Sequence, residues 1–252
     1  MMPWFIWNGQ NSLSDYGLWI SRLPKRIRSE ERHEEIEIPG RAGSVIMLEG
    51  EDIYSSYSAE MVVTARNEIN IDKVINWLRG SGELILSTDI NKARKARIVG
   101  EVAFERVGNC LMQATIPFRM QPFSMNRFPA NDQFSISSTA VMVINPGDVA
   151  SRPHIVLTSG AALASDKFVC LNFGSGQMGL NLYNLALNEV VEIDCDAHLI
   201  YQQTGNGKVL WTKKFTGEFP HINAVGATTI QITGDPSPAN ATATVDPNWR
   251  WL

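Results

Sequence analysis

The chain has 252 residues, 44% of them hydrophobic, which is enough for sizeable cores and argues against wholesale disorder. Its 22 lysines and arginines and 26 aspartates and glutamates give a net charge of −4. The sequence therefore has neither the basic footprint of a nucleic-acid-binding domain nor a polybasic membrane signal. No apolar run approaches the roughly 18 residues of a transmembrane helix, so no membrane insertion is expected.

Charge and cysteine usage describe the organisation of the chain. Residues 1–130 hold 16 basic and 16 acidic residues, whereas residues 131–252 hold 6 and 10. This shift predicts a boundary near residue 130, and we assign domains to residues 1–133 and 134–252. The three cysteines, Cys110, Cys170 and Cys195, lack CxxC spacing, which argues against a disulfide framework and fits synthesis in a reducing cytosol.

Turn signals define the first elements. Asn8-Gly9 is a hairpin signal, because both residues tolerate a positive φ. A further turn is expected within Ser14–Leu18. The extended stretch 34–38 leads into Pro39-Gly40, where proline presets φ and glycine supplies the positive φ of a type II turn.

Strands and one short helix should follow. The extended stretches are Val45–Leu48, Tyr54–Arg66 and Leu84–Leu86. The helix is predicted by four apolar residues on one face, cap candidates before it and glycines after it: Ile71, Val74, Ile75 and Leu78, with Asn70 or Asp72, and Gly80 or Gly82.

The rest of the first domain is predicted as a basic hairpin and two strands. Residues 91–97 form the expected hairpin tip, and Ile98–Val107 and Leu111–Phe118 are the strands. Pro122 should close this part, because proline cannot continue a central strand.

The second half is predicted as a β-sandwich or jelly roll. Short strand candidates recur with Gly, Asn and Pro between them, at a spacing of roughly 8–12 residues. The candidates are 134–144, 153–158, 167–173, 180–187, 189–195, 198–203, 208–215, 228–233 and 241–245.

One motif favours an alternative function. Gly174–Gly179 matches G-x-G-x-x-G, follows an apolar strand, and precedes Asp194 by the distance seen in dinucleotide-binding folds. The residues after it, however, alternate with period two and include asparagines, which are poor helix formers. A glycine-rich hairpin is therefore favoured over a nucleotide site, and no cofactor is expected.

Two further patterns are candidate binding sites. A strand over Val191–Leu199 would place Glu192, Asp194, Asp196 and His198 on one face, but residues about 6.5–7 Å apart leave one metal ion at most two ligands there. A solvated face is favoured, and Cys195 should be buried. The tryptophans Trp211, Trp249 and Trp251 could stack on sugars, although core packing is favoured. No catalytic motif is present, and an enzyme is not expected.

The ordered turn motifs resemble those of the distal tail proteins (Dit) of long-tailed bacteriophages. The resemblance extends over nearly the whole chain, although Ala42 stands where that family often has aspartate. The matching segments are Asn8-Gly9, 15–18, Ile38–Gly43, Pro122-Phe123, Asn145-Pro146-Gly147, Arg152-Pro153, Val191–Asp194, Gly217–Pro220 and Pro247–Arg250.

The resemblance implies a mainly β chain with an N-terminal β-sandwich, which closes into a homo-hexameric ring, and a galectin-like C-terminal sandwich. It implies a structural virion protein, made in the bacterial cytoplasm, at the distal end of a siphophage tail. Its partners would be the tail tube protein, the tail-associated tip or lysin protein and other baseplate proteins. DNA would pass through the ring without specific binding. The alternative is an adsorption protein that binds cell-wall carbohydrate.

Three residue sets follow as candidate sites. Architectural or interface turns are expected at Asn8, Gly9, Asp15, Tyr16, Gly17, Pro39, Gly40, Arg41 and Gly43. An inter-subunit arm is expected over Arg22 to Ile38, because the segment is long, charged and extended; its candidates are Arg22, Lys25, Arg26, Arg28, Arg32 and Ile36. A luminal or surface basic tip is expected at Lys92, Arg94, Lys95 and Arg97.

Overall fold

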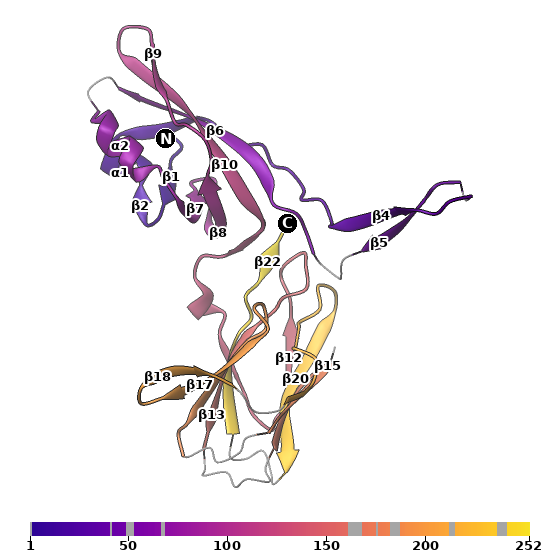
Figure 1. Ribbon diagram of the computed structural model, residues 1–252. Helices are drawn as coiled ribbons and strands as arrows, with labels where there is room; N and C mark the ends of the chain where they lie inside the picture. The colour runs from indigo at the N-terminus through magenta and orange to yellow at the C-terminus, as the bar shows by residue number, and fades with distance from the viewer. Residues whose placement is uncertain are drawn as a thin grey trace. The chain divides into compact units, whose positions relative to one another are not determined.

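The computed structural model describes residues 2–40, 42–48, 53–66, 69–160, 168–174, 176–181, 187–211, 215–235 and 241–252. The chain forms two compact units that divide between Arg127 and Phe128, and we call them the N-terminal and C-terminal units (Figure 1). The expected mainly β class, with β-sandwich folds, is confirmed. The division into domains at 133/134 stays a prediction. No helix in the described ranges is long and apolar enough to span a membrane.

The N-terminal unit consists of strands with two short helices. Its elements are β1 (Phe5–Trp7), β2 (Gln10–Asn11), α1 (Ser12–Tyr16), β3 (Leu18–Arg22), β4 (His33–Glu37), β5 (Ser44–Leu48), β6 (Tyr57–Arg66), α2 (Ile71–Trp77), β7 (Ser81–Leu86), β8 (Asp89–Ile98), β9 (Phe104–Val107) and β10 (Leu111–Asn126).

The main sheet of this unit encloses its own apolar face. Its strands follow the order β2-β1-β7-β8-β10-β6-β3, and β9 also pairs with β10. Near its two ends, the Ile20 N–H of β3 donates to the carbonyl of Pro3, just before β1, at 2.8 Å. Period-two alternation turns every second residue inward. The resulting core includes Phe5, Trp7, Leu18, Met61, Val63, Ile116 and Phe118, with Val74 and Leu78 near α2.

Two short helices stand where one was expected. Helix α2 confirms the predicted one, whereas α1 occupies the segment predicted as a turn. The Asn11 side chain caps α1 by accepting the N–H groups of Leu13 and Ser14, and Gly17 ends it in the left-handed conformation. The cap and the stop therefore turn a local turn signal into a single helical turn.

The prediction that Pro122 closes the last strand of this unit was wrong. Strand β10 runs through Pro117 and Pro122 to Asn126. Its pairing with β6 ends at Met120, and its register with β8 shifts between Met120 and Ser124. Pro122 thus occupies an irregular stretch in which its missing N–H interrupts no regular ladder.

The predicted basic hairpin tip was also wrong, because residues 91–97 lie within β8, which pairs with β7 and β10. The turn of the β7–β8 hairpin lies at Ser87-Thr88 instead. After β8 the chain turns at Gly100, which has a positive φ. The strand expected over Ile98–Val107 is therefore shorter and begins at Phe104, as β9.

The C-terminal unit is a sandwich of two antiparallel sheets. After a 3₁₀ turn at Pro129–Asn131, its strands are β11 (Phe134–Ile136), β12 (Val141–Ile144), β13 (His154–Ser159), β14 (Phe168–Phe173), β15 (Gly176–Asn181), β16 (Val190–Asp194), β17 (Leu199–Thr204), β18 (Gly207–Leu210), β19 (Phe215–Gly217), β20 (Ala227–Asp235) and β21 (Ala241–Asp246). The short strand β22 (Arg250–Trp251) follows and belongs to neither sheet of the sandwich. One sheet has the order β11-β21-β13-β16-β17-β18 and the other β12-β20-β14-β15-β19.

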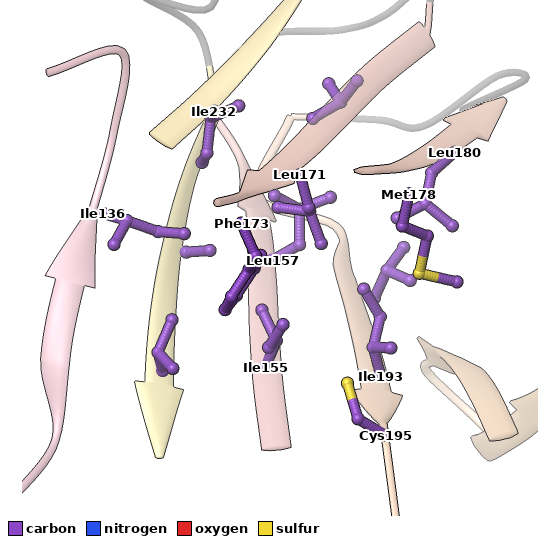
Figure 2. Packing of buried hydrophobic residues seen from close by; sticks show 14 of the residues in the cluster. Ile136, Ile155, Leu157, Leu171, Phe173, Met178, Leu180, Ile193, Cys195 and Ile232 are labelled. Atoms are coloured by element: carbon purple, nitrogen blue, oxygen red, sulfur yellow. The ribbon is translucent and has the colours of Figure 1, made fainter. Parts of the chain in front are cut away.

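Side chains from both sheets form one core in this unit (Figure 2). Ile155 on β13 and Ile193 on β16 come from the first sheet, and Leu171 and Phe173 on β14 come from the second. The stretch 134–144, predicted as one strand, is two strands that contribute to different sheets. A single chain segment thus crosses from one layer to the other.

Gly147 packs so closely that no side chain fits there. A Cβ at this position would lie 2.2 Å from the carbonyl oxygen of Arg250, which also accepts the Asp148 N–H at 3.0 Å. Asn145 fixes the turn by accepting the Gly147 N–H through Oδ1 at 2.8 Å. The Asn-Pro-Gly motif therefore joins the start of this sandwich to the end of the chain.

Replacing Gly147 by alanine should destabilise the C-terminal unit by about 1–3 kcal/mol, because the new methyl forces the backbone of Arg250 to move. Thermal unfolding measures the effect. Gly205→Ala is the matched control, since a Cβ there meets no atom within 4 Å. Equal unfolding temperatures for the two variants would contradict this packing.

Candidate assembly surfaces

The Asn8-Gly9 turn joins β1 to β2 and is held by the neighbouring strand. Both residues have positive φ, 49° and 81°, as the hairpin signal predicts. The Asn8 Oδ1 accepts the Glu83 N–H at 3.2 Å, and the backbone N–H of Asn8 donates to the Glu83 carbonyl. A Cβ on Gly82 would lie 1.6 Å from Asn8 Oδ1, so Gly82 provides the space for this side chain.

Asp15 stabilises the single turn of α1. Its carboxylate accepts the Ser14 hydroxyl and the Asn11 N–H, both at 2.8 Å. These two hydrogen bonds lower the pKa of Asp15, the Ser14 contact having the larger effect. Gly17 has φ 67° and donates its N–H to the Leu13 carbonyl.

Tyr16 belongs to a stack of three aromatic rings. Trp77 of α2 lies between Tyr16, at a centroid distance of 4.1 Å, and Phe5 of β1, at 5.5 Å. Burial, followed by the charge of Asp15, raises the pKa of Tyr16. The stack fastens both helices to the edge of the sheet, so Asp15, Tyr16 and Gly17 all make contacts within their own domain.

Pro39, Gly40 and Gly43 lie at the exposed tip of the β4–β5 hairpin. Both glycines have φ 83°, which ordinary side chains rarely adopt. Arg41, predicted with them, lies outside the described residues.

We define the arm as residues 22–48, which comprise the end of β3, an extended root and the β4–β5 hairpin (Figure 1). The root is exposed except at Pro24 and Ser29. Hydrogen bonds from Arg32 N–H to the Ile53 carbonyl and from Ser55 N–H to the Glu30 carbonyl hold its far end. The hairpin then forms a two-stranded sheet of its own, in register from His33↔Leu48 to Glu37↔Ser44.

The arm exposes many large apolar side chains. Those in the hairpin have exposed fractions from 38% for Ile36 to 60% for Ile46, and Met47 is 54% exposed. The other exposed apolar residues of the arm are Leu23, Ile27 and Ile38. A two-stranded hairpin is marginally stable in water, and each strand keeps one unpaired edge. The arm therefore has the properties of a segment that is completed by a partner.

The four residues of the predicted basic tip lie on two faces of β8. Arg94 faces inward with its cross-strand neighbour Leu84, whereas Lys95 pairs with Glu83 on the outer face. Arg94 donates to the Tyr57 hydroxyl at 2.7 Å, and Lys92 lies with it at the same cavity. Arg97 lies on the outer face opposite Arg119 of β10.

That cavity brings together residues that sequence analysis kept apart. It has a volume of about 150 Å³ and is lined by Lys25 and Arg26 of the arm root as well as by Lys92 and Arg94. In the curled sheet, the first half of β8 lies beside the residues that follow β3. No local sequence pattern signals this meeting, because it depends on how the sheet curls.

The glycine-rich motif forms a hairpin, as the period-two pattern predicts. Strand β14 pairs antiparallel with β15, from Phe173↔Gly176 to Phe168↔Asn181. The segment after the motif is therefore a strand rather than the helix that would hold a pyrophosphate. Ser175 lies outside the described residues.

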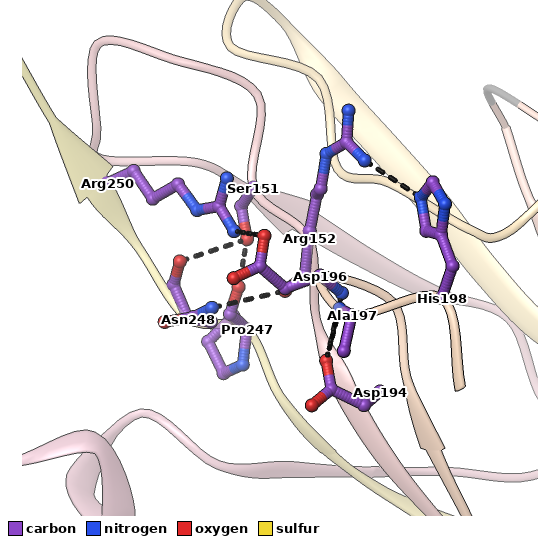
Figure 3. Close-up of polar contacts among 9 residues, drawn as sticks. All are labelled: Ser151, Arg152, Asp194, Asp196, Ala197, His198, Pro247, Asn248 and Arg250. Atoms are coloured by element: carbon purple, nitrogen blue, oxygen red, sulfur yellow. Dashed lines mark hydrogen bonds and ion pairs between the residues drawn. The ribbon is translucent and has the colours of Figure 1, made fainter. Parts of the chain in front are cut away.

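The strand predicted over Val191–Leu199 was wrong, because β16 ends at Asp194 and a turn follows. Asp194 accepts the N–H groups of Asp196 and Ala197 through Oδ1, at 3.0 and 2.9 Å, and so bends the chain (Figure 3). The predicted row of carboxylates and imidazole is broken. Its members have separate partners instead: Asp196 pairs with the buried Arg250 at 2.5 Å, His198 contacts Arg152 at 2.8 Å, and Glu192 pairs with Lys208.

The tryptophans and Cys195 serve the core. Trp211 and Trp249 are only 8% and 7% exposed, which removes them as platforms for sugars. Trp251 is half-buried and donates to the Pro146 carbonyl at 3.2 Å. Cys195 is 1% exposed, and burial, followed by the charge of Asp194, raises the pKa of its thiol.

At the sequence level, no family model and no curated protein matches the chain. Among solved structures, the crystal structure of SPP1 Dit (gp 19.1), described as a hub of the adsorption apparatus in phages that infect Gram-positive bacteria, matches over 100% of both chains. Its TM-score is 0.69 at 14% identity. The chain has the fold of a distal tail protein. Two structures of the phage P2 baseplate in its activated conformation, with Ca and with Sr, match 92% of this chain and 98% of theirs, at 8% identity and TM-scores of 0.40 and 0.41.

Several of the motifs that resemble those of distal tail proteins form close backbone contacts in this fold. Asn145-Pro146-Gly147 and Pro247–Arg250 meet at the close contact between Gly147 and Arg250. Gly217, with φ 87°, leaves no room for a side chain, since a Cβ would lie 1.9 Å from the Gln177 carbonyl oxygen. These residues secure the sandwich.

Thiol labelling of the native chain should separate the cysteines by burial. Exposed Cys110 should react with iodoacetamide within minutes, whereas Cys195 should stay unmodified until the protein unfolds, because its thiol is buried and protonated. Mass spectrometry of digested samples, with a urea-unfolded control, identifies the sites. Rapid native labelling of Cys195 would contradict the burial.

Proposed function

We propose that this chain is a structural component of a phage tail tip, which assembles through its arm into a homo-hexameric ring. The ring joins the tail tube to the adsorption apparatus in the virion and encloses the DNA exit channel. The fold shared with a distal tail protein supports the class of role, and the arm supports the assembly.

The arm is the observation that carries the proposal. Its exposed apolar residues, Ile36, Ile46 and Met47 among them, would be buried against another subunit. Burying one such side chain contributes about 1.5–3 kcal/mol, and six arms would contribute together. The contact joins two different surfaces of identical chains, which is the geometry that closes rings.

The tail tube protein, the tail-associated tip or lysin protein and other baseplate proteins are the partners that we propose for the ring. DNA would pass without specific binding, and basic residues such as Lys95 and Arg97 stand on an outer sheet face that DNA could pass. Weak contacts suit a conduit, because each neutralised phosphate adds salt-dependent affinity. A carbohydrate-binding role receives no support from the buried tryptophans.

The purified chain should assemble into particles of six times its 28.0 kDa mass, with a central hole. Light scattering coupled to size exclusion measures the mass, and negative-stain images show the hole. A chain that stays monomeric up to millimolar concentration would contradict the ring.

Replacing Ile46 and Met47 together by serine should weaken assembly at least tenfold, since the lost apolar burial is worth about 1.5–3 kcal/mol for each side chain. Because both side chains are exposed in the single chain, its thermal unfolding should not change. The control is Met142→Ser with Ile144→Ser, whose side chains are 72% and 71% exposed on β12. Unchanged assembly of the arm variant would exclude the arm as the contact.

A further inference from the structure

The cavity of the N-terminal unit has an apolar floor. Leu84, Leu86 and Met120 line it, and Leu84 and Met120 are 2% and 1% exposed. Its volume of about 150 Å³ is that of a cavity able to hold a benzene-sized apolar group. The floor therefore suits one branched aliphatic side chain.

The rim of the cavity is cationic. Lys25 and Arg26 stand on the arm root, and Lys92 and Arg94 stand on β8, with Asp89 as the single lining acid. The guanidinium of Arg94 is already oriented by its bond to a tyrosine hydroxyl. An occupant that combines an apolar group with a carboxylate would match both floor and rim.

The two ends of the arm carry opposite charges. The root, residues 22–32, holds five basic and two acidic residues, a balance of +3. The hairpin, residues 33–48, holds three glutamates and one arginine, a balance of −2 with histidine neutral. On β4, alternation puts Glu34 and Ile36 on one face and Glu35 on the other, where Glu35 lies 3.8 Å from His33.

We propose that this cavity receives strand β4 from a neighbouring copy, with Ile36 on the apolar floor and Glu34 at the cationic rim. The proposal rests on the proposed ring and names its docking site. The side chains of Glu34 and Ile36 lie on one face of β4, about 6.5–7 Å apart along the strand, so both can face the same cavity.

The arm of the same chain is a poor occupant. Its root lines the cavity at Arg26, and backbone hydrogen bonds of Glu30 and Arg32 to residues 53–55 fix the direction of the chain before the hairpin begins. A second copy meets no such constraint. Because hairpin and cavity are different surfaces, each copy can give one contact and accept one.

Charge reversal on either side tests the docking. Lys25→Glu with Arg26→Glu should raise the concentration needed for half-assembly about a hundredfold, and Glu34→Lys about tenfold, because close interfacial charge pairs become repulsive. The matched controls are Arg79→Glu with Arg106→Glu, which makes the same change of charge at exposed residues outside both the arm and the cavity, and Glu35→Lys on the opposite face of β4. Both controls should assemble within about threefold of the wild type.

Mixing the two reversed variants provides the decisive result. In an even-membered ring they can alternate, so that every unaltered hairpin meets an unaltered cavity and every Glu34→Lys hairpin meets a reversed cavity. The equimolar mixture should regain the wild-type particle mass in light scattering. Normal rings from the cavity variant alone, equal loss in the controls, or a mixture without rescue would overturn the docking site and leave the ring standing. A wild-type chain that never assembles would overturn the ring and the docking site together.

Discussion

Two strands cannot bury the apolar side chains that they carry, and this constraint sets the β4–β5 hairpin apart from the rest of the molecule. The β4–β5 hairpin leaves Ile36, Ile46 and Met47 in water and keeps an unpaired edge on each side. A chain whose domains already enclose their own cores has no internal surface left for this segment. The hairpin is therefore the surface on which the proposed self-assembly depends.

Each unit is closed by contacts between its own segments. In the N-terminal unit, the hydrogen bond between Ile20 and Pro3 joins the ends of a curled sheet, and the Phe5–Trp77–Tyr16 stack holds the helices at its edge. In the C-terminal unit, the ion pair of Arg250 with Asp196 holds the last strand in place. Side chains that are already ordered by such contacts lose little further conformational entropy in a proposed association.

The sequence predicted features that depend on local rules. The Asn8-Gly9 turn, helix α2 and the mainly β character followed from φ preferences, a 3.6-residue pattern and alternation. Its errors fell where one particular hydrogen bond or pairing partner decides the boundary: α1 depended on a cap at Asn11, Pro122 was tolerated where a register shifts, and β16 stopped because Asp194 bonds the following turn. In each case a hydrogen bond or pairing partner, rather than propensity, set the boundary.

For the candidate surfaces, the sequence alone determined the charged, extended arm and the turn at its tip, because charge runs, proline and glycine act through their immediate neighbours. It also determined that the arm is basic at its root and acidic beyond it. Only the tertiary structure decided that Lys25 and Arg26 meet Lys92 and Arg94 around an apolar cavity, and that Lys95 and Arg97 face away from it. That meeting depends on the curl of a sheet formed by strands distant in the chain, and no pattern read along the chain encodes such a closure.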